Sequence, residues 1–204
     1  MMPGNQFSQR LIYGDFLSPD NLPTDGTIAY ELGGIGLDDP FAGLQYQVWT
    51  AQILNPRKSN SFVVISAPNT PQQTLFSFSG ISQISLAFDQ NMTPAIAFTA
   101  QGIAYLWWYD ATVPGYVFFQ LPNNSHSPNV TLDDKRQLSL DNSFSDIILA
   151  YLRDQVLYFR QLRDRFTVEY TLLTNITYHN AQLYKIGMCS TDRLLFQINA
   201  DLYA

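Results

Sequence analysis

The stretch that decides the fold is "SDIILAYLRDQVLYFRQLRDRF", residues 145–166, which fits either a helix or a pair of strands. As a helix, it would place Ile148, Leu152 and Val156 on one face, because apolar residues recur at spacings of three and four. As strands, "DIILAYL" and "VLYFRQL" are short β-favouring runs separated by the polar "RDQ", the pattern of a hairpin. The stretch alone leaves both structures open.

A second stretch, "PAIAFTAQGIAYLWWYDATVPGYVFFQLP" at residues 94–122, has only one good interpretation. Gly102, Pro114 and Gly115 divide it into pieces that are too short for a stable helix. The pieces are rich in Ile, Val, Tyr, Phe and Trp, which favour strands. The pattern predicts three strands.

The two stretches are related by an internal repeat. Shifting one by 53 positions (156 minus 103) aligns Ala97-Phe98 with Ala150-Tyr151, Ile103 with Val156 and Tyr105 with Tyr158. Each copy continues through a charged turn, 110–115 or 163–165, into a third strand, "YVFFQL" or "FTVEYTL". Each also follows a leading strand, "ISLAFDQN" or "NVTLDD". The repeat therefore predicts strands in 145–166 as well, within a four-stranded antiparallel unit of the size of one propeller blade.

Residues 44–204 are predicted to form one all-β domain of antiparallel meanders, either β-propeller-like or a β-sandwich. "LQYQVWTAQIL" and "SFVVISAP" indicate a hairpin, and "TLFSFSG" indicates a further strand. A partial third unit, "LYKIGMCSTDRLLFQI", ends the chain. The strands "LQYQVWT" and "FVVIS" are expected to complete this unit and so close a ring; an open meander completed by a neighbouring chain is the alternative.

Residues 1–43 are predicted to form an extended N-terminal arm. "SPDNLPTDG" and "ELGGIGLDDPFAG" crowd Pro, Gly and Asp between short apolar pieces, which is typical of turns and loops. Isolated aromatic residues in such a polar segment need a surface on which to dock. We therefore expect the arm to be anchored on a partner protein by Tyr13, Phe16, Tyr30 and Phe41.

The composition favours a protein that binds other proteins. Only 14% of the 204 residues are charged, against a usual share of about 25%, so much of the surface is neutral. A net charge of -6 disfavours binding to nucleic acid or to an anionic membrane. No apolar run approaches the roughly 20 residues that span a bilayer, and the N-terminus has no signal-peptide pattern. We expect the chain to be made and kept in a cytosol-like compartment.

No residue set predicts catalysis, a metal site or a cofactor. Cys189 is the only cysteine, and His126 and His179 lack the spacing of metal ligands. Two acidic pairs, 38–39 and 133–134, are adjacent, so on a strand their members diverge; a glycosidase that uses Asp39 or Asp133 is the weakest hypothesis.

Arginines 153, 160, 163 and 165 lie between acidic residues, which predicts local ion pairs or subunit contacts rather than a nucleic-acid site.

The aromatic cluster "YLWWY" is the best candidate for ligand binding. Side chains alternate along a strand, so Tyr105, Trp107 and Tyr109 are expected to share one face and Trp108 the other. One face is predicted to be core, and the other to pack against a neighbouring sheet or subunit. The alternative function is a carbohydrate-binding module in which Trp107, Trp108 and Tyr109 stack on a glycan of the host surface.

Several runs resemble a group of tailed-bacteriophage structural proteins that belong to the tail or tail fibre. These runs are "YELGGIGLDDPFAGLQYQVWTAQI", "SLAFDQNMTPAIAF", "LWWYD", "LDDKR" and "DIILAYLRDQVLYFRQLRDRF". The resemblance implies a non-enzymatic structural subunit, made in the host cytoplasm and present in the virion. Its implied partners are other virion proteins, and a homo-oligomer or ring is expected.

Overall fold

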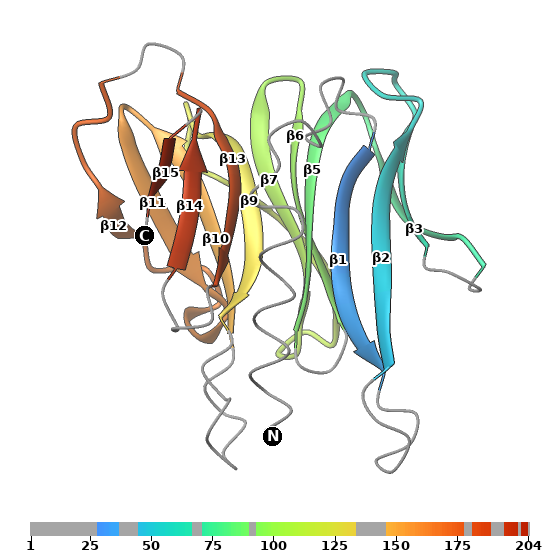
Figure 1. Ribbon diagram of the computed structural model, residues 1–204. Helices are drawn as coiled ribbons and strands as arrows, with labels where there is room; N and C mark the ends of the chain where they lie inside the picture. The colour runs from blue at the N-terminus through green and yellow to red at the C-terminus, as the bar shows by residue number, and fades with distance from the viewer. Residues whose placement is uncertain are drawn as a thin grey trace.

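The computed structural model describes residues 28–36, 45–66, 71–89, 93–133, 146–177, 181–188, 194–199 and 201–203. These residues form an all-β structure of antiparallel sheets, with one short 3-10 helix (Figure 1). The predicted all-β class is therefore confirmed. None of the helical segments within these ranges has the length and apolarity needed to cross a membrane.

The strands form four sheets that follow one another along the chain. The first sheet contains β1 (Ile28–Gly36), β2 (Gln45–Leu54), β3 (Ser61–Ser66) and β4 (Gln73–Phe78). The second contains β5 (Ile81–Phe88), β6 (Pro94–Ala100), β7 (Ile103–Asp110) and β8 (Gly115–Gln120). The third contains β9 (His126–Asp133), β10 (Asp146–Arg153), β11 (Val156–Gln161) and β12 (Tyr170–Leu173), with the 3-10 helix η4 (Leu162–Asp164) before β12. The fourth contains β13 (Leu183–Met188), β14 (Leu194–Ile198) and β15 (Asp201–Tyr203).

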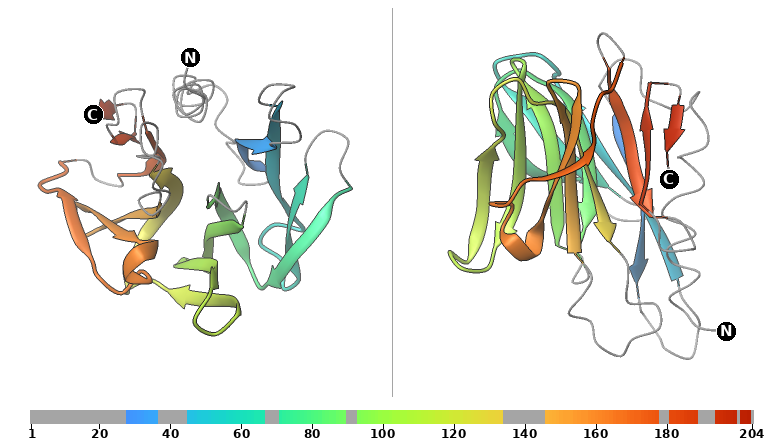
Figure 2. Two further views of the ribbon diagram at one scale, coloured as in Figure 1. Left: turned by 90° about the horizontal axis from the view of Figure 1, so that it is seen from below. Right: turned by 90° about the vertical axis from the view of Figure 1, so that its left-hand side faces the viewer.

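The sheets stand side by side around an arc, with the first and the fourth at its ends (Figure 2). The first strand of each sheet contacts the first strand of the next, so β1 meets β5, β5 meets β9 and β9 meets β13. Each of the first three sheets then runs outward in chain order. Consequently β4, β8 and β12 are the outer edge strands.

Each space between neighbouring sheets holds one hydrophobic core. The second sheet is buried on both faces: Ile96 and Phe98 pack toward the first sheet, whereas Ala95 and Ala97 pack toward the third. This explains why "PAIAF" is apolar at every position instead of alternating. Burying a large side chain such as Phe98 contributes about 1.5–3 kcal/mol, so these cores hold the row of sheets together.

The internal repeat is confirmed at the level of strand register. Phe98 pairs with Tyr105 in the β6–β7 hairpin, and Tyr151 pairs with Tyr158 in the β10–β11 hairpin. Both partners are shifted by the same 53 positions, since 98 plus 53 is 151 and 105 plus 53 is 158. Residues 146–166 are therefore a hairpin followed by a short 3-10 turn, not a long helix.

The turns of the two hairpins have the same backbone but different residues. Gln101 and Gly102 have φ of 52° and 79°, and the equivalent Asp154 and Gln155 have φ of 51° and 64°. Two-residue hairpin loops with positive φ at both positions are type I′ turns, which favour Gly at the second position. Gln155 therefore holds a conformation that costs a residue with a side chain about 1 kcal/mol.

We expect Gln155→Gly to raise the free energy of unfolding by about 1 kcal/mol, because glycine removes this backbone cost. Urea denaturation of the purified chain measures the change. Gly102→Ala is the matched control and should lower stability by a similar amount, since no atom lies within 4 Å of the added Cβ and only the backbone is strained. Equal stability of both variants and the natural chain would contradict this explanation of the turn.

Two sequence expectations differ from the structure, and the expected arm is described only in part. The third strand of the second repeat begins at Tyr170 and not at Phe166, because Arg165 and Phe166 have positive φ and continue the turn. β2 and β3 do not complete the last unit; they pair with β1 and β4 in a sheet of their own. Within the expected arm, residues 28–36 form β1, while 1–27 and 37–43 lie outside the described residues.

Candidate functional site

A cluster of exposed apolar side chains lies at the outer rim of the second sheet. Four of the eight large apolar side chains exposed in the described part of the chain are here, at 39–57% exposure. We call these four the rim patch: Tyr109, Val113, Tyr116 and Phe118. A concentration of this kind at one place marks a contact surface more strongly than scattered exposed residues do.

Strand β8 builds most of the rim patch because its two faces differ. Tyr116 and Phe118 are exposed, whereas the alternating Val117 and Phe119 pack against the core between the second and third sheets. β8 ends the order of its sheet, so within the described residues its outer backbone edge has no neighbouring strand. The strand thus offers both a hydrogen-bonding edge and exposed aromatic rings.

Ring contacts hold the exposed aromatic side chains in place. Tyr116 is stacked on Trp107, with ring centroids 4.0 Å apart and planes at 5°, and Tyr109 meets Tyr116 at 5.4 Å in an edge arrangement. Phe118 meets Phe76 of β4 at 5.3 Å. Burial and, to a lesser extent, the nearby Asp89 raise the pKa of Tyr116. The patch is therefore preorganised, which lowers the entropy cost of binding a partner.

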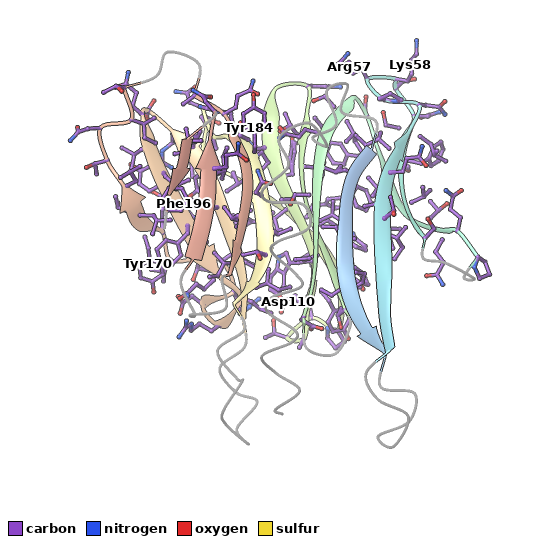
Figure 3. All side chains as sticks on the ribbon, viewed as in Figure 1. Arg57, Lys58, Asp110, Tyr170, Tyr184 and Phe196 are labelled. Atoms are coloured by element: carbon purple, nitrogen blue, oxygen red, sulfur yellow. The ribbon has the colours of Figure 1, made fainter. Side chains whose placement is uncertain are left out.

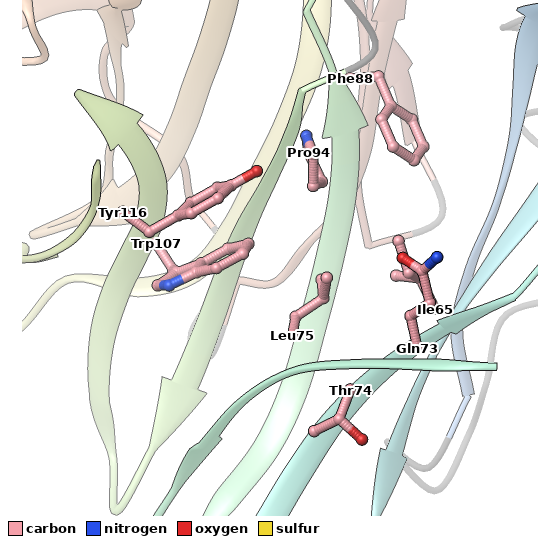
Figure 4. A pocket seen from close by; sticks show the side chains of 8 residues that line it. All are labelled: Ile65, Gln73, Thr74, Leu75, Phe88, Pro94, Trp107 and Tyr116. Atoms are coloured by element: carbon pink, nitrogen blue, oxygen red, sulfur yellow. The ribbon is translucent and has the colours of Figure 1, made fainter. Parts of the chain in front are cut away.

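A pocket of about 400 Å³ opens beside the rim patch, between the first and second sheets (Figure 4). The stacked rings of Trp107 and Tyr116 form one wall, and Leu75 and Pro94 form others. The remaining lining residues are Ile65, Gln73, Thr74 and Phe88. No lining residue is charged, so the pocket suits an uncharged group such as an apolar side chain of a partner protein.

The residues of the alternative carbohydrate site are separated by the fold. Trp107 and Tyr109 lie on the face toward the first sheet, and Trp108 lies on the opposite face, as the alternation predicted. Both indoles are buried: Trp107 between Phe76 and Tyr116, and Trp108 against Phe166 at 5.1 Å. Only Tyr109 of the three is exposed.

The predicted arm anchors are mostly beyond what the structure describes. Tyr13, Phe16 and Phe41 lie outside the described residues, and of Tyr30 only the backbone, in β1, is described. Their role therefore stays a prediction.

Among the residues that the structure describes, the acidic pairs and the histidines are represented only by Asp133 and His126. Asp39 and His179 lie outside those residues. Asp133 ends β9 opposite Asp146 of β10. His126 begins β9, and burial lowers its pKa.

The arginines of the third sheet form the local ion pairs that the sequence predicted. Arg153 donates two hydrogen bonds to Glu169, from Nη1 at 2.9 Å and Nη2 at 2.6 Å, and Arg160 Nη2 donates to the same carboxylate at 3.1 Å. The hydroxyl of Tyr151 also bonds Glu169, and it accepts from Arg160 Nε at 2.8 Å. This network fixes the turn between β11 and β12.

A second ion pair joins neighbouring sheets. Arg165, in the turn before β12, donates from Nη2 to Asp110 at 2.5 Å. Asp110 ends β7 and also accepts from the amide and the hydroxyl of Thr112. Asp110 lies at one end of the sheets, while Arg57 and Lys58 lie at the opposite end (Figure 3).

Sequence reasoning did not single out Tyr116 and Phe118 as surface residues. The available signal was the run "ATVPGYVFFQLPNNS", residues 111–125, which contains no charged residue and alternates exposed and packed positions in β8.

Comparison with protein-family models, with curated protein sequences and with solved structures gave no match for this chain.

Proposed function

We propose that this chain is a non-enzymatic structural subunit of a tailed-phage particle, built as a β-propeller-like domain that assembles with other virion proteins. One observation carries the proposal: the outer edge strands of the first three sheets, β4, β8 and β12 ("QTLFSF", "GYVFFQ" and "YTLL"), contain no charged residue, whereas the edge strand of the fourth sheet, β15 ("DLY"), contains Asp201. Proteins that stay monomeric commonly protect such edges with charged side chains, especially Lys, or with Pro. Unprotected edges favour a subunit whose edges are covered in an assembly.

The arrangement of the sheets supports the propeller-like part of the proposal. Consecutive antiparallel sheets of three or four strands stand around an arc, with the first strand of each nearest to that of the next. Radial repetition of meanders is the architecture of propeller blades. In this arrangement the inner strands hold the domain together and the outer edges face partners.

Localising the chain on tailed-phage particles tests this function. Gold-labelled antibodies against the purified chain should mark one location on tailed particles released by cells that carry its coding sequence, and the chain should sediment with those particles. Particles from cells in which the coding sequence is interrupted are the control and should show no label. If the chain stays in the soluble fraction while intact particles form, the proposed function is wrong.

A further inference from the structure

We propose that the pocket between the first and second sheets receives an aromatic side chain of another virion protein, from a segment that has a basic residue beside the aromatic one. The inference rests on the proposed function and deepens it, because it names the chemistry by which the chain would bind a neighbour. The space between the second and third sheets already contains such a side chain at the equivalent place.

That side chain is Phe166, in the turn before β12. Its ring is fully buried and meets Trp108 of β7 at 5.1 Å in an edge arrangement. Arg160 Nη1 donates to the Phe166 carbonyl at 2.7 Å, so the backbone beside the ring is held as well. A ring from the turn of one sheet thus fills the space beside the facing sheet.

The first two sheets share a strand register, which identifies their equivalent residues. Val63 pairs with Phe76 across β3 and β4, and Leu106 pairs with Phe119 across β7 and β8. Both partners differ by 43 positions, since 63 plus 43 is 106 and 76 plus 43 is 119. The strand pair β3–β4 therefore corresponds to the strand pair β7–β8.

Two residues that line the pocket are the counterparts of two residues that hold Phe166. Ile65 corresponds to Trp108 at the shift of 43, and Trp107 corresponds to Arg160 at the shift of 53. The pocket therefore lies, between the first and second sheets, where Phe166 lies between the second and third.

The equivalent side chain of the second sheet does not enter the pocket. Val113, in the turn before β8, is the counterpart of Phe166 at the shift of 53. It is 57% exposed and is not among the residues that line the pocket. No residue that the structure describes takes the place of the ring here, so a side chain of a partner can enter.

The lining of the pocket suits an aromatic ring. Ile65, Phe88 and Trp107 are buried and apolar, whereas Gln73 and Thr74 are exposed and polar (Figure 4). Aromatic rings favour offset or edge contacts with other rings, and ligand pockets commonly combine apolar walls with a few neutral polar groups. The buried residues would contact the incoming ring, and the exposed amide and hydroxyl could bond the backbone of the segment that carries it.

A β-bulge in β4 favours a side chain over a whole strand as the occupant. Val63 pairs with Phe76 and Val64 pairs with Thr74, so Leu75 is an extra residue in β4. The bulge lets the consecutive Thr74 and Leu75 both line the pocket. Bulges also interrupt pairing at a sheet edge, which disfavours the addition of a strand beside the pocket.

Charge favours a basic segment and disfavours a second copy of this chain. The chain has a net charge of -6, so two copies repel each other. Asp89 follows a lining residue in the sequence, and its negative charge acts on Tyr116. At the counterpart place, Arg165 precedes Phe166 and pairs with Asp110 of the facing sheet. A partner segment with a basic residue beside its aromatic one would find a similar acidic group at the pocket.

Titration of the purified full chain with N-acetylphenylalanine amide, followed by NMR, tests the aromatic site. The indole N–H signal of Trp107 and the side-chain amide signal of Gln73 should shift and saturate. N-acetylalanine amide is the matched control and should bind at least about 10-fold more weakly, because a methyl group buries far less apolar surface than a phenyl ring. Equal binding of the two probes, or shifts confined to residues outside the pocket, would overturn the proposal.

Leu75→Trp should weaken binding of the phenylalanine probe at least about 10-fold, because the larger indole occupies part of the pocket. Leu172→Trp is the matched control and should bind the probe like the natural chain, since Leu172 is also a half-buried leucine of an outer strand but packs in another core. Unchanged binding by a folded Leu75→Trp variant would contradict the pocket as the site.

Photolabelling keeps the test decisive if Leu75→Trp does not fold. A photoreactive diazirine derivative of N-acetylphenylalanine amide should label the natural chain at pocket-lining residues, and an excess of the unmodified probe should suppress the labelling. Labelling only outside the pocket would overturn the proposal.

Cross-linking in tailed particles identifies the occupant. The photoreactive residue p-benzoylphenylalanine in place of Thr74 should link the chain to a different virion protein, at or beside an aromatic residue with a basic neighbour. The same residue in place of Thr171, which is exposed on β12, is the control and should not give this link. A link from position 74 to a second copy, or within the same chain, would overturn the choice of partner.

The pocket and the virion function can fail separately. A chain that labels tailed particles but binds both probes equally would remove only the aromatic site. A chain that prefers the phenylalanine probe but never enters particles would remove the virion function and leave the aromatic site.

Discussion

Replacing Phe166 with alanine is expected to lower the free energy of unfolding by about 4 kcal/mol, the range found when a large core aromatic is removed. Phe166 follows η4 and is fully buried, although it lies in a turn. Its ring meets Trp108 at 5.1 Å and belongs to the core between the second and third sheets. Its loss would therefore leave a cavity between two sheets, not at the surface.

Urea denaturation at neutral pH measures the loss, with Val168→Ala as the control. Val168 lies two residues along the same turn region but is exposed, so its truncation should change stability by less than about 0.5 kcal/mol. Similar losses for the two variants would show that the turn, and not the buried ring, determines the effect.

The strands of the repeat could be predicted because the same strand pattern occurs twice in the sequence. Gly102 and Pro114 break any helix in the first copy, whereas the second copy has no such residue. Aligning Tyr105 with Tyr158 transferred the strand assignment, and the structure gives both tyrosines the same cross-strand pairing. The internal repeat thus predicted strands in the second copy, where no Gly or Pro excludes a helix.

The turn at Phe166 could not be predicted from local preferences. Left-handed backbone is expected at Gly, Asn or Asp, but here Arg165 and Phe166 adopt φ of 50° and 57°. The burial of the ring and the hydrogen bond from Arg160 Nη1 to the Phe166 carbonyl at 2.7 Å stabilise this backbone, and both depend on tertiary contacts. The predicted strand "FTVEYTL" therefore begins four residues before the observed β12.

Local sequence patterns also did not predict the sheet to which each strand belongs. β2 and β3 read as strands from their residues, but their assignment to the first sheet depends on pairing with β1 and β4. For the candidate site, alternation predicted correctly that Trp107 and Trp108 face opposite ways. It did not identify Tyr116 and Phe118 as exposed, because that depends on β8 being the outermost strand.

Glu169→Gln is the second change with a large expected effect, because the Glu169 carboxylate accepts hydrogen bonds from three side chains. Burial alone would raise the pKa of Glu169, but hydrogen bonds from Arg153, Tyr151 and Arg160 outweigh it and lower the pKa from 4.5 to about 2. A shift of this size corresponds to about 3 kcal/mol of stability at neutral pH. The amide keeps the shape of the side chain but loses the charge, and it leaves the buried guanidinium of Arg160 without a counterion.

The dependence on pH separates this charge effect from a packing defect. A carboxyl group with a lowered pKa stabilises the folded chain above the unfolded-state value of 4.5, and this contribution is lost as the pH falls toward about 2. The difference between the natural chain and Glu169→Gln should therefore be full at pH 7, shrink below pH 4.5 and nearly vanish near pH 2. Asp164→Asn, in the same turn region, is the control and should change stability by less than about 1 kcal/mol, because Asp164 contacts the exposed Tyr170 hydroxyl at 2.8 Å. A difference that stays constant from pH 7 to pH 2 would mean that the shape of the side chain, and not its charge, stabilises this turn.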